Sequence, residues 1–535
     1  MLDQPAASHR ARLRDRPRLD FQDHLADLEA NGLLVRIDRP INKDTELHPL
    51  VRWQFLGGVP EDKRRAFLFT HVTDSKGRRY DIPVVVGALA ASPDIYAMGM
   101  GQEVKDIGEA WMRAIANPIA PIAVSAPRCQ EVVLTGDDLK APGGLARLPV
   151  PVSTPGFDSA PYLTATLCVT RDPDSGIQNM GTYRAALKAA DRLVVRMVAR
   201  EASGAGGYLH WLKYRKRKLA IDMDELGVAG ALAGAPIEIA KSATIDLDVP
   251  ASAEIVIEGL IDPEKLEPEA PFGESNGYVA LEAYNMPMRV TAITHKRAPV
   301  FTSIISQVTP SESSVVKKVA YEPLFLSHLR DRLGIKGVRR VVMHERLTNL
   351  RPVIFLQLAE GTPRSEVWRA LHGAATLQSN CGKIVIAVSE DIDPASMDAV
   401  LWSLAYRTNP IEDVHLVPHR GGVQGAQYGP KTTDSGMLVD ATRKYPMAPL
   451  ALPTREYMEH ARALWEELDL YPLNVQSPWH GYGLGDWTDR WETFARRAAT
   501  GDWELTGNET LARQRGGLTP ETPARFDDKP KKPPD

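Results

Sequence analysis

The chain has 535 residues, 43% of them hydrophobic and 25% charged, which is the composition of a folded globular protein too long for a single hydrophobic core. Its net charge of -4 provides no basic field for a polyanion, so nucleic acid is not expected as a partner. No apolar run approaches the roughly 18 residues that a membrane-spanning helix needs, so no membrane association is expected. The three cysteines, Cys129, Cys168 and Cys381, lie far apart, which favours a reducing, cytoplasmic location without disulfides.

The first 120 residues predict a small α/β domain behind a basic leader. Residues 1–19 contain several arginines, but no apolar segment follows, so this stretch is expected to be a solvated leader. A helix is predicted over 20–30, because Leu25 and Leu28 provide core positions and Gly32 suits the C-terminal cap. The other elements expected in the N-terminal domain, residues 20–120, are strands over 33–37, 66–69 and 83–87 and a helix over 107–116.

Residues 121–310 change character and are rich in strand signals. Alternation of side chains from Tyr162 to Thr170 predicts one half-buried strand. Further strands are predicted over 236–239, 252–258 and 288–293. Several strands separated by long excursions are typical of a β-barrel or sandwich with inserted helices.

The next part of the chain predicts a long linker helix followed by an open α/β sheet. The helix is expected over 312–333, within a linker of residues 311–335. The sheet domain is expected over residues 336–450, because strands there alternate with helices. Its predicted strands lie over 352–358, 383–388 and 413–417, and its predicted helices over 365–377 and 394–407.

Residues 451–518 predict a C-terminal extension. The helix expected over 455–468 should pack across a neighbouring element. The segment after it is expected to dock on the body of the protein, and it is marked by Trp479, Trp487, Trp491 and Trp503. Residues 519–535 are rich in proline and charge, which predicts a disordered tail.

Three charged residues carry the chemistry that the sequence indicates. Glu269 and Glu274 lie five residues apart on a glycine-containing turn, and Arg184 ends the upstream motif 179–184. Each alone would be a solvated charge. Together they offer a guanidinium, a carboxylate to hold it and a second carboxylate free to carry a proton. Such a set can bind a substrate carboxylate and protonate the carbon that loses it, so the sequence predicts an enzyme that removes CO2 from an organic acid.

The two carboxylates are expected to differ in pKa. The opposite charge of an arginine should lower the pKa of the carboxylate that holds it, whereas an apolar cavity should raise the pKa of the other carboxylate. Such a difference assigns one of them as the electrostatic holder and the other as the acid.

Two other segments permit more than one interpretation. Residues 203–210 are rich in glycine and end in His210, so they could let backbone approach a cofactor or could form a mobile loop. They lack the lysine-serine/threonine ending of a phosphate-binding Walker loop. The acidic cluster 222–225 precedes an apolar run, and the plain interpretation is a helix N-terminus with acids favoured by the helix dipole.

With these segments the chain resembles the UbiD family of decarboxylases, which use prenylated FMN. The resemblance runs from about residue 21 to about residue 445, and its specific parts are 179–184, 268–278, 390–394 and 434–444. It implies an N-terminal α/β domain, a central split β-barrel that binds the flavin over 121–310, and a C-terminal α/β oligomerisation domain joined by the long helix.

The resemblance also implies roles for individual residues. Arg184 corresponds to the catalytic arginine, Glu269 to its paired carboxylate and Glu274 to the catalytic acid. The expected ligands of a divalent ion that bridges the protein and the flavin phosphate are Asn179, His210 and Glu225, and the expected cofactor contacts include Tyr183 and Arg184. Oxygen ligands with one imidazole suit Mn2+ or Mg2+, and K+ is a further candidate cation. The segment between His210 and Glu225 is shorter than in many family members, and the alternative for His210 is a plain loop histidine.

The expected function is the reversible, non-oxidative decarboxylation of an aromatic or α,β-unsaturated acid. Arg184 would place the carboxylate and Glu274 would protonate the carbon. The alternative substrate is an aromatic acyl-CoA such as phthaloyl-CoA, whose phosphates the basic run 213–218 could meet. An alternative of another class is a flavin-binding assembly protein without catalysis. A flavin oxidoreductase is disfavoured because no dinucleotide fingerprint occurs. The implied partners are a flavin prenyltransferase and further copies of the chain in a dimer or hexamer.

Overall fold

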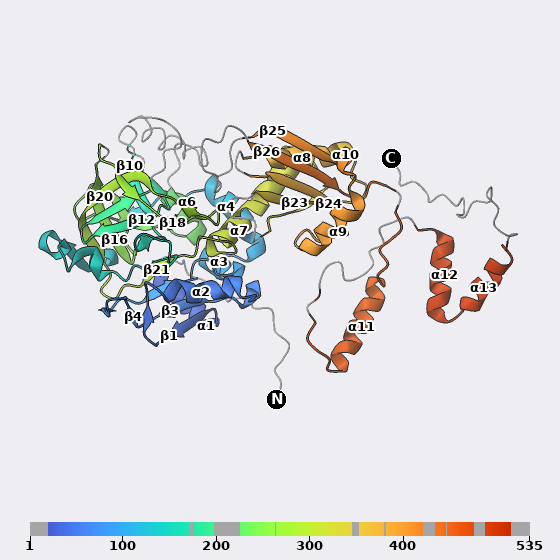
Figure 1. Cartoon of the computed structure of the whole chain (residues 1–535), viewed down its shortest axis with the longest axis horizontal. Helices are drawn as coiled ribbons and strands as arrows, with labels where there is room; N and C mark the ends of the chain where they lie inside the picture. Colours follow the sequence, from blue (N-terminus) through green and yellow to red (C-terminus); the bar gives the residue numbers. More distant parts are fainter. Residues whose placement is uncertain are drawn as a thin grey trace. The chain divides into compact units, whose positions relative to one another are not determined.

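The computed structural model describes residues 20–171, 176, 178–196, 225–262, 264–344, 352–378, 381–420, 434–445, 447–473, 475 and 487–514. These residues form a mixed α/β fold, which confirms the predicted fold class (Figure 1). They make two compact units, one ending at Leu324 and the other beginning at Phe325. The predicted leader, the glycine-rich segment with His210, the basic run 213–218 and the tail from residue 519 all lie outside the described residues.

The first unit begins with a four-stranded sheet. Its order is β1 (Leu34–Ile37), β3 (Ala66–Phe69), β6 (Val84–Val86) and β21 (Phe301–Ser303). The outer pairs are parallel and the central pair is antiparallel. The helices α1 (Phe21–Ala30) and α2 (Leu47–Leu56) lie on either side of this sheet (Figure 1). Since β21 comes from far along the chain, the first 120 residues and the central part share one sheet and one hydrophobic core.

Helix α1 shows why its sequence pattern predicted a helix correctly. Asp20 caps its N-terminus, because the Asp20 carboxylate accepts a hydrogen bond from the backbone N–H of Gln22 at 2.9 Å. Leu28 is fully buried, as predicted, and Gly32 adopts a φ of +66° just beyond the helix end.

The central part of this unit is built around one long strand, β20 (Ala283–His295). It pairs antiparallel with four other strands of a seven-stranded sheet. The other strands of this sheet are β8 (Val132–Thr135), β9 (Tyr162–Leu163), β12 (Ala185–Ala189), β13 (Arg192–Val195), β16 (Ile255–Ile261) and β17 (Glu267–Glu269). Strands β13 and β17 both pair with the first residues of β20, which brings their ends together.

The single strand predicted from Tyr162 to Thr170 is wrong. The chain forms β9, which pairs with β12, and then β10 (Cys168–Arg171), which pairs with β11 (Gln178–Gly181) in a separate hairpin. The alternation of side chains continues through the stretch, but the chain passes from one sheet to another within it.

The remaining elements of the first unit are short strands and helices. A three-stranded sheet contains β2 (Ile41–Asn42), β4 (Val72–Thr73) and β5 (Arg79–Tyr80), and a second contains β7 (Ile122–Ala123), β14 (Glu238–Lys241) and β15 (Asp248–Pro250). Strands β18 (Phe272–Gly273) and β19 (Val279–Ala280) form a hairpin. The helices are α3 (Pro93–Met100), α4 (Ile107–Ala116), α6 (Glu225–Ala233) and the first part of α7 (Glu312–Ser327). A π-helical turn over His328–Arg332 continues α7, so the long helix predicted over 312–333 is confirmed.

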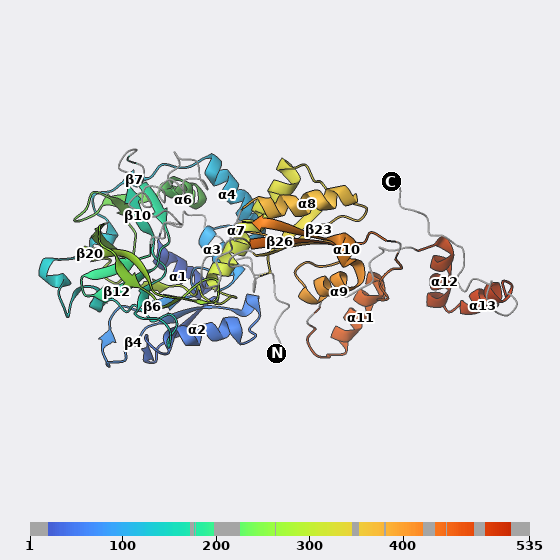
Figure 2. The same cartoon turned by 45° about the horizontal axis from the view of Figure 1, so that its top comes forward.

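The second unit is an open five-stranded sheet. Its order is β22 (Val338–Val342), β23 (Val353–Leu358), β24 (Ile384–Ser389), β26 (Asp434–Ala441) and β25 (Val414–Arg420). Its three central strands are parallel. Helices α8 (Arg364–Thr376) and α9 (Met397–Arg407) cover opposite faces, and α10 (Pro410–Asp413) leads into β25 (Figure 2). The predicted alternation of strands and helices is confirmed, with boundaries shifted by a few residues.

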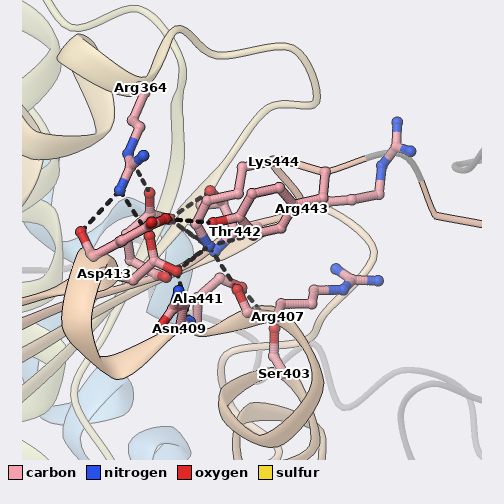
Figure 3. A network of polar contacts seen from close by, with 12 residues as sticks. Arg364, Ser403, Arg407, Asn409, Asp413, Ala441, Thr442, Arg443 and Lys444 are labelled. Atoms are coloured by element: carbon pink, nitrogen blue, oxygen red, sulfur yellow. Dashed lines mark hydrogen bonds and ion pairs between the residues drawn. The ribbon is translucent and has the colours of Figure 1, made fainter.

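The motif 434–444 contributes to a network of polar contacts in this unit (Figure 3), and Asp391 of the motif 390–394 forms a buried ion pair in the same unit. Arg407 donates two hydrogen bonds to Asp391, at 2.7 and 2.5 Å, and both side chains are almost fully buried. Lys444 donates to the backbone carbonyl oxygen atoms of Arg407, Asp440 and Thr442 at 2.6 to 3.1 Å. These contacts connect the ends of β24 and β26 to α9, so this part of the resemblance reflects folding of the unit.

The C-terminal helices are α11 (Arg455–Glu467), α12 (Asp489–Thr500) and α13 (Trp503–Leu511), and none of them has a buried residue. The helix predicted over 455–468 is confirmed, whereas its packing across a neighbouring element and the docking of the tryptophan-rich segment on the body stay predictions. Trp487 and Trp491 contact each other, with ring centroids 5.5 Å apart. Trp479 lies outside the described residues. No helix in the described ranges combines the length and apolarity needed to cross a membrane.

Candidate active site

Two strand ends and a tight turn present the glutamates. Glu269 ends β17, which pairs with β20, and its side chain is fully buried. Glu274 follows β18 in the turn that joins it to β19, where the Glu274 N–H donates to the carbonyl oxygen of Tyr278 at 2.8 Å. Gly277 adopts a φ of +90° in this turn, a conformation that favours glycine. The turn therefore fixes the backbone position of Glu274 directly after β18.

Arg184 connects the two glutamates. It precedes β12, and its Nε and Nη2 donate to Oε1 and Oε2 of Glu269 at 2.8 and 3.0 Å. Its Nη1 donates to Oε1 of Glu274 at 2.7 Å. Asn285 of β20 donates a further hydrogen bond to Glu269 Oε2 at 3.2 Å. The structure thus brings Arg184, Glu269 and Glu274 together, as the sequence predicted, and it adds a direct contact between the Arg184 guanidinium and Glu274, whose role as the proton carrier stays a prediction.

Two aromatic rings form an apolar wall beside these charges. The guanidinium carbon of Arg184 lies 4.5 Å from the centroid of the Phe272 ring and 5.9 Å from that of Tyr162. The two rings contact each other, with centroids 4.1 Å apart. Burial raises the pKa of Tyr162 to about 12, so its hydroxyl stays protonated and accepts a hydrogen bond from the backbone N–H of Ala270. An apolar wall excludes water and strengthens the charge interactions inside the site.

Sequence reasoning missed one charged residue of this site, Arg196. It follows β13, and its backbone N–H donates to the carbonyl oxygen of Arg184 at 3.1 Å. Its Nη1 lies 3.5 Å from Glu274 Oε1 and 3.7 Å from Glu269 Oε2. The signal that could have found it is the β12–β13 hairpin, whose register pairs Ala185 with Val195 and so places residue 196 opposite residue 184.

The predicted metal ligands are only partly described. Asn179 lies in β11, where its backbone is opposite Thr170, and its side chain is outside the description. Glu225 is the first residue of α6 and is partly buried, whereas His210 lies outside the described residues. No cluster of three or more histidine, cysteine, aspartate or glutamate side chains suited to a metal occurs in the parts of the chain that the structure describes. The metal site therefore stays a prediction.

Tyr183, the other predicted cofactor contact, is buried next to Arg184, and its carbonyl oxygen accepts a hydrogen bond from the Thr166 hydroxyl. A cavity of about 1240 Å³ lies elsewhere in the first unit. Its lining includes Arg36, Tyr80 and Arg297, and none of the predicted site residues lines it. Side-chain chemistry, and not cavity volume, therefore identifies the site.

Domain models of one protein family match most of the chain. The N-terminal domain of the 3-octaprenyl-4-hydroxybenzoate carboxy-lyase, UbiD, matches residues 25–115, and its C-terminal domain matches residues 315–441. The Rift-related domain of the same family matches residues 122–222 and 216–308, which contain Arg184, Glu269 and Glu274.

Solved structures of UbiD-class enzymes are similar over nearly their whole length. The enzyme HmfF from Pelotomaculum thermopropionicum, in complex with FMN, is 28% identical with a TM-score of 0.67, covering 81% of this chain and 95% of that chain. An evolved dimeric form of HmfF in complex with prFMN is 26% identical with a TM-score of 0.68, covering 83% and 100%.

A more distant structure shares the fold. Vanillic acid decarboxylase from Sedimentibacter hydroxybenzoicus, in its open form, is 22% identical with a TM-score of 0.67, covering 85% of this chain and 100% of that chain. Because the matched domains together span well over half of the sequence, the chain belongs to the UbiD family of carboxy-lyase enzymes.

Proposed function

We propose that this protein catalyses the reversible, non-oxidative decarboxylation of an aromatic or α,β-unsaturated carboxylic acid with prenylated FMN. The observation that carries the proposal is the contact of one guanidinium, that of Arg184, with a fully buried glutamate and a second, partly exposed one. The likeness to HmfF, whose structures contain FMN and prFMN, supports the cofactor.

The residues present fit the cofactor by their chemistry. An amide, a carboxylate and an imidazole, from Asn179, Glu225 and His210, suit Mn2+ or Mg2+ beside a flavin phosphate, because these ions prefer oxygen ligands and accept an imidazole. K+ is a further candidate. Bound prenylated FMN would supply the electron sink for the carbon that loses CO2. The protein supplies placement, charge and the proton.

Each of the three residues has a distinct part in this proposal. Glu269 holds Arg184 through two parallel hydrogen bonds, a geometry that fixes the guanidinium in position. Arg184 then binds the substrate carboxylate with its remaining N–H groups. The wall formed by Tyr162 and Phe272 favours departure of the carboxylate as neutral CO2. Glu274 enters the reaction protonated and gives its proton to the carbon.

The domain boundaries, the oligomeric state and the substrate class also belong to this proposal. We retain the three-domain division with a split barrel over 121–310, and a homo-oligomer, for which the dimeric form of an evolved HmfF is the supporting likeness. A CoA thioester of an aromatic acid is the alternative substrate, but the basic run 213–218 that favoured it lies outside the described residues.

The test is co-expression with a flavin prenyltransferase, followed by the cofactor mass of the anaerobically purified protein and CO2 release from aromatic and unsaturated acids. We expect bound prenylated FMN and turnover. Glu274→Gln should keep the cofactor and lose turnover at least about a hundredfold, as loss of a general acid does. Glu267→Gln, which neutralises a carboxylate on β17 outside the Arg184 network, is the matched control and should stay active. Cofactor binding without turnover in the wild-type protein would favour the assembly-protein alternative.

A further inference from the structure

Arg196 places a second guanidinium group beside the two glutamates. Its Nη1 lies 3.5 Å from Glu274 Oε1 and 3.7 Å from Glu269 Oε2. This nitrogen is buried, yet it has no hydrogen-bond partner in the part of the chain that the structure describes. A buried N–H group without an acceptor is destabilising. The N–H groups of Nη1 are therefore available to an acceptor that these residues do not provide.

The neighbouring arginine has less capacity to bind a ligand. Arg184 donates from Nε and Nη2 to Glu269 and from Nη1 to Glu274, so each of its nitrogens already has a partner and only one N–H group on each Nη remains for a ligand. Burial and the positive charge of Arg184 lower the pKa of Arg196, which indicates that its own charge is incompletely compensated. Of the two guanidinium groups, Arg196 gains more from an anionic ligand.

The charges of the four side chains support the same conclusion. With both glutamates ionised, Arg184, Arg196, Glu269 and Glu274 sum to zero. With Glu274 protonated, as a proton donor must be, the sum is one positive charge. One substrate carboxylate returns the sum to zero. Without Arg196 the carboxylate would add an uncompensated negative charge to a site walled by two aromatic rings, where unpaired charge is unfavourable.

We propose that Arg196 is a second substrate-binding residue, which donates hydrogen bonds from Nη1 to the carboxylate that the substrate loses; this rests on the decarboxylase function proposed above. In the net reaction, RCOO− and protonated Glu274 give RH, CO2 and ionised Glu274. The bond between carbon and carboxylate breaks, its electron pair stays with the carbon, and the Glu274 proton forms the new C–H bond.

The negative charge of the substrate is thereby transferred to Glu274, beside Arg196 Nη1. Arg196 thus has an anionic partner before and after the reaction, and the site remains neutral throughout. The assignment defines the substrate at its reacting end as a free carboxylate. An amide at that position lacks the charge that Arg196 binds.

The test is isothermal titration of the protein purified after co-expression with the prenyltransferase, using benzoate, 4-hydroxybenzoate and 3,4-dihydroxybenzoate, each against its amide. Arg196→Gln should raise the Kd of the best-bound acid about tenfold or more and change the Kd of the amide less than about twofold, because a charge-assisted hydrogen bond is lost. Arg196→Lys, which keeps the charge, should recover part of the affinity. Arg192→Gln is the matched control, because Arg192 begins the strand that Arg196 follows, is half exposed and pairs with Glu267 outside the site; it should change neither Kd.

Three results would overturn the assignment: an unchanged Kd for the acid in Arg196→Gln, a parallel loss of acid and amide, or a wild-type protein that binds none of the acids. CO2 release from the same acids separates this assignment from the proposed function. A wild-type protein that binds acid through Arg196 but releases no CO2 contradicts the decarboxylase function alone. An active enzyme with the same KM in Arg196→Gln contradicts the Arg196 assignment alone.

Discussion

Glu312, the first residue of α7, allows a quantitative prediction about pH and stability. Its side chain is fully buried and accepts hydrogen bonds from the backbone N–H groups of Ile305 and Ala90, at 2.8 and 3.4 Å. Burial raises the pKa of Glu312 from 4.5 to about 7 despite these hydrogen bonds. The folded protein therefore binds this proton more tightly than the unfolded chain does.

The sign and the magnitude follow from this difference. Between pH 4.5 and 7 the folded state keeps the proton and the unfolded state has lost it, so the free energy of unfolding falls as pH rises. A shift of about 2.5 pKa units corresponds to about 3 kcal/mol. His48 acts in the opposite direction, because burial lowers its pKa to about 3, and its contribution is lost as pH falls below 6.5. The pH dependence of wild-type stability therefore does not isolate the contribution of Glu312. The difference in the free energy of unfolding between the wild type and Glu312→Gln does isolate it.

Urea unfolding followed by circular dichroism between pH 4.5 and 8 would measure this contribution. We expect the free energy of unfolding of the wild-type protein, minus that of Glu312→Gln, to fall by about 3 kcal/mol across the window. Glu109→Gln removes an exposed carboxylate and serves as the control with a flat difference. A difference between wild type and Glu312→Gln that does not change with pH would refute the reasoning.

Three further predictions concern the buried contacts. Asp391→Asn should destabilise the second unit by about 3 to 5 kcal/mol, because it leaves the buried Arg407 guanidinium without its anion; a shift in the melting temperature below a degree would contradict this. Gly108→Ala should lower the free energy of unfolding by about 1 to 3 kcal/mol, because the added Cβ would lie 2.3 Å from Pro323 Cβ. Gly507→Ala, where the added Cβ meets no other atom, should instead stabilise α13 by up to about 1 kcal/mol. Calorimetry would show changes in melting temperature of opposite sign for the two variants. Glu269→Gln should abolish turnover and also lower the melting temperature, whereas Glu274→Gln should lower turnover alone. An equal drop in the melting temperature of both variants would argue against separate roles for the two glutamates.

Much of the fold could be predicted because its signals are local. Helix α1 has its cap, apolar positions and terminal glycine within a dozen residues, and the alternating strands and helices of the second unit follow the same logic. The prediction failed for residues 162–170, where period-two alternation continues while the chain changes sheets. Alternation reports which face of a strand is buried, but it does not say which strand is the partner.

The element against which the C-terminal helices pack could not be predicted, for a related reason. Apolar side chains of α11 and aromatic side chains of α12 indicate a helix face suited to packing, but they do not identify the element that would cover this face. In the described chain none of these residues is buried, and Trp487 contacts its neighbour Trp491.

The sequence by itself determined the family, the α/β class and the set of Arg184, Glu269 and Glu274, since residue types and spacing within short motifs carry that information. Only the tertiary structure decided how these groups meet. Arg184 and Glu269 are 85 positions apart, and they come together because the strands β13 and β17 both pair with the start of β20. The same pairing places Arg196 beside the glutamates and gives Glu274 a guanidinium partner. Long-range strand register, which no local pattern encodes, therefore set the charge balance of the site.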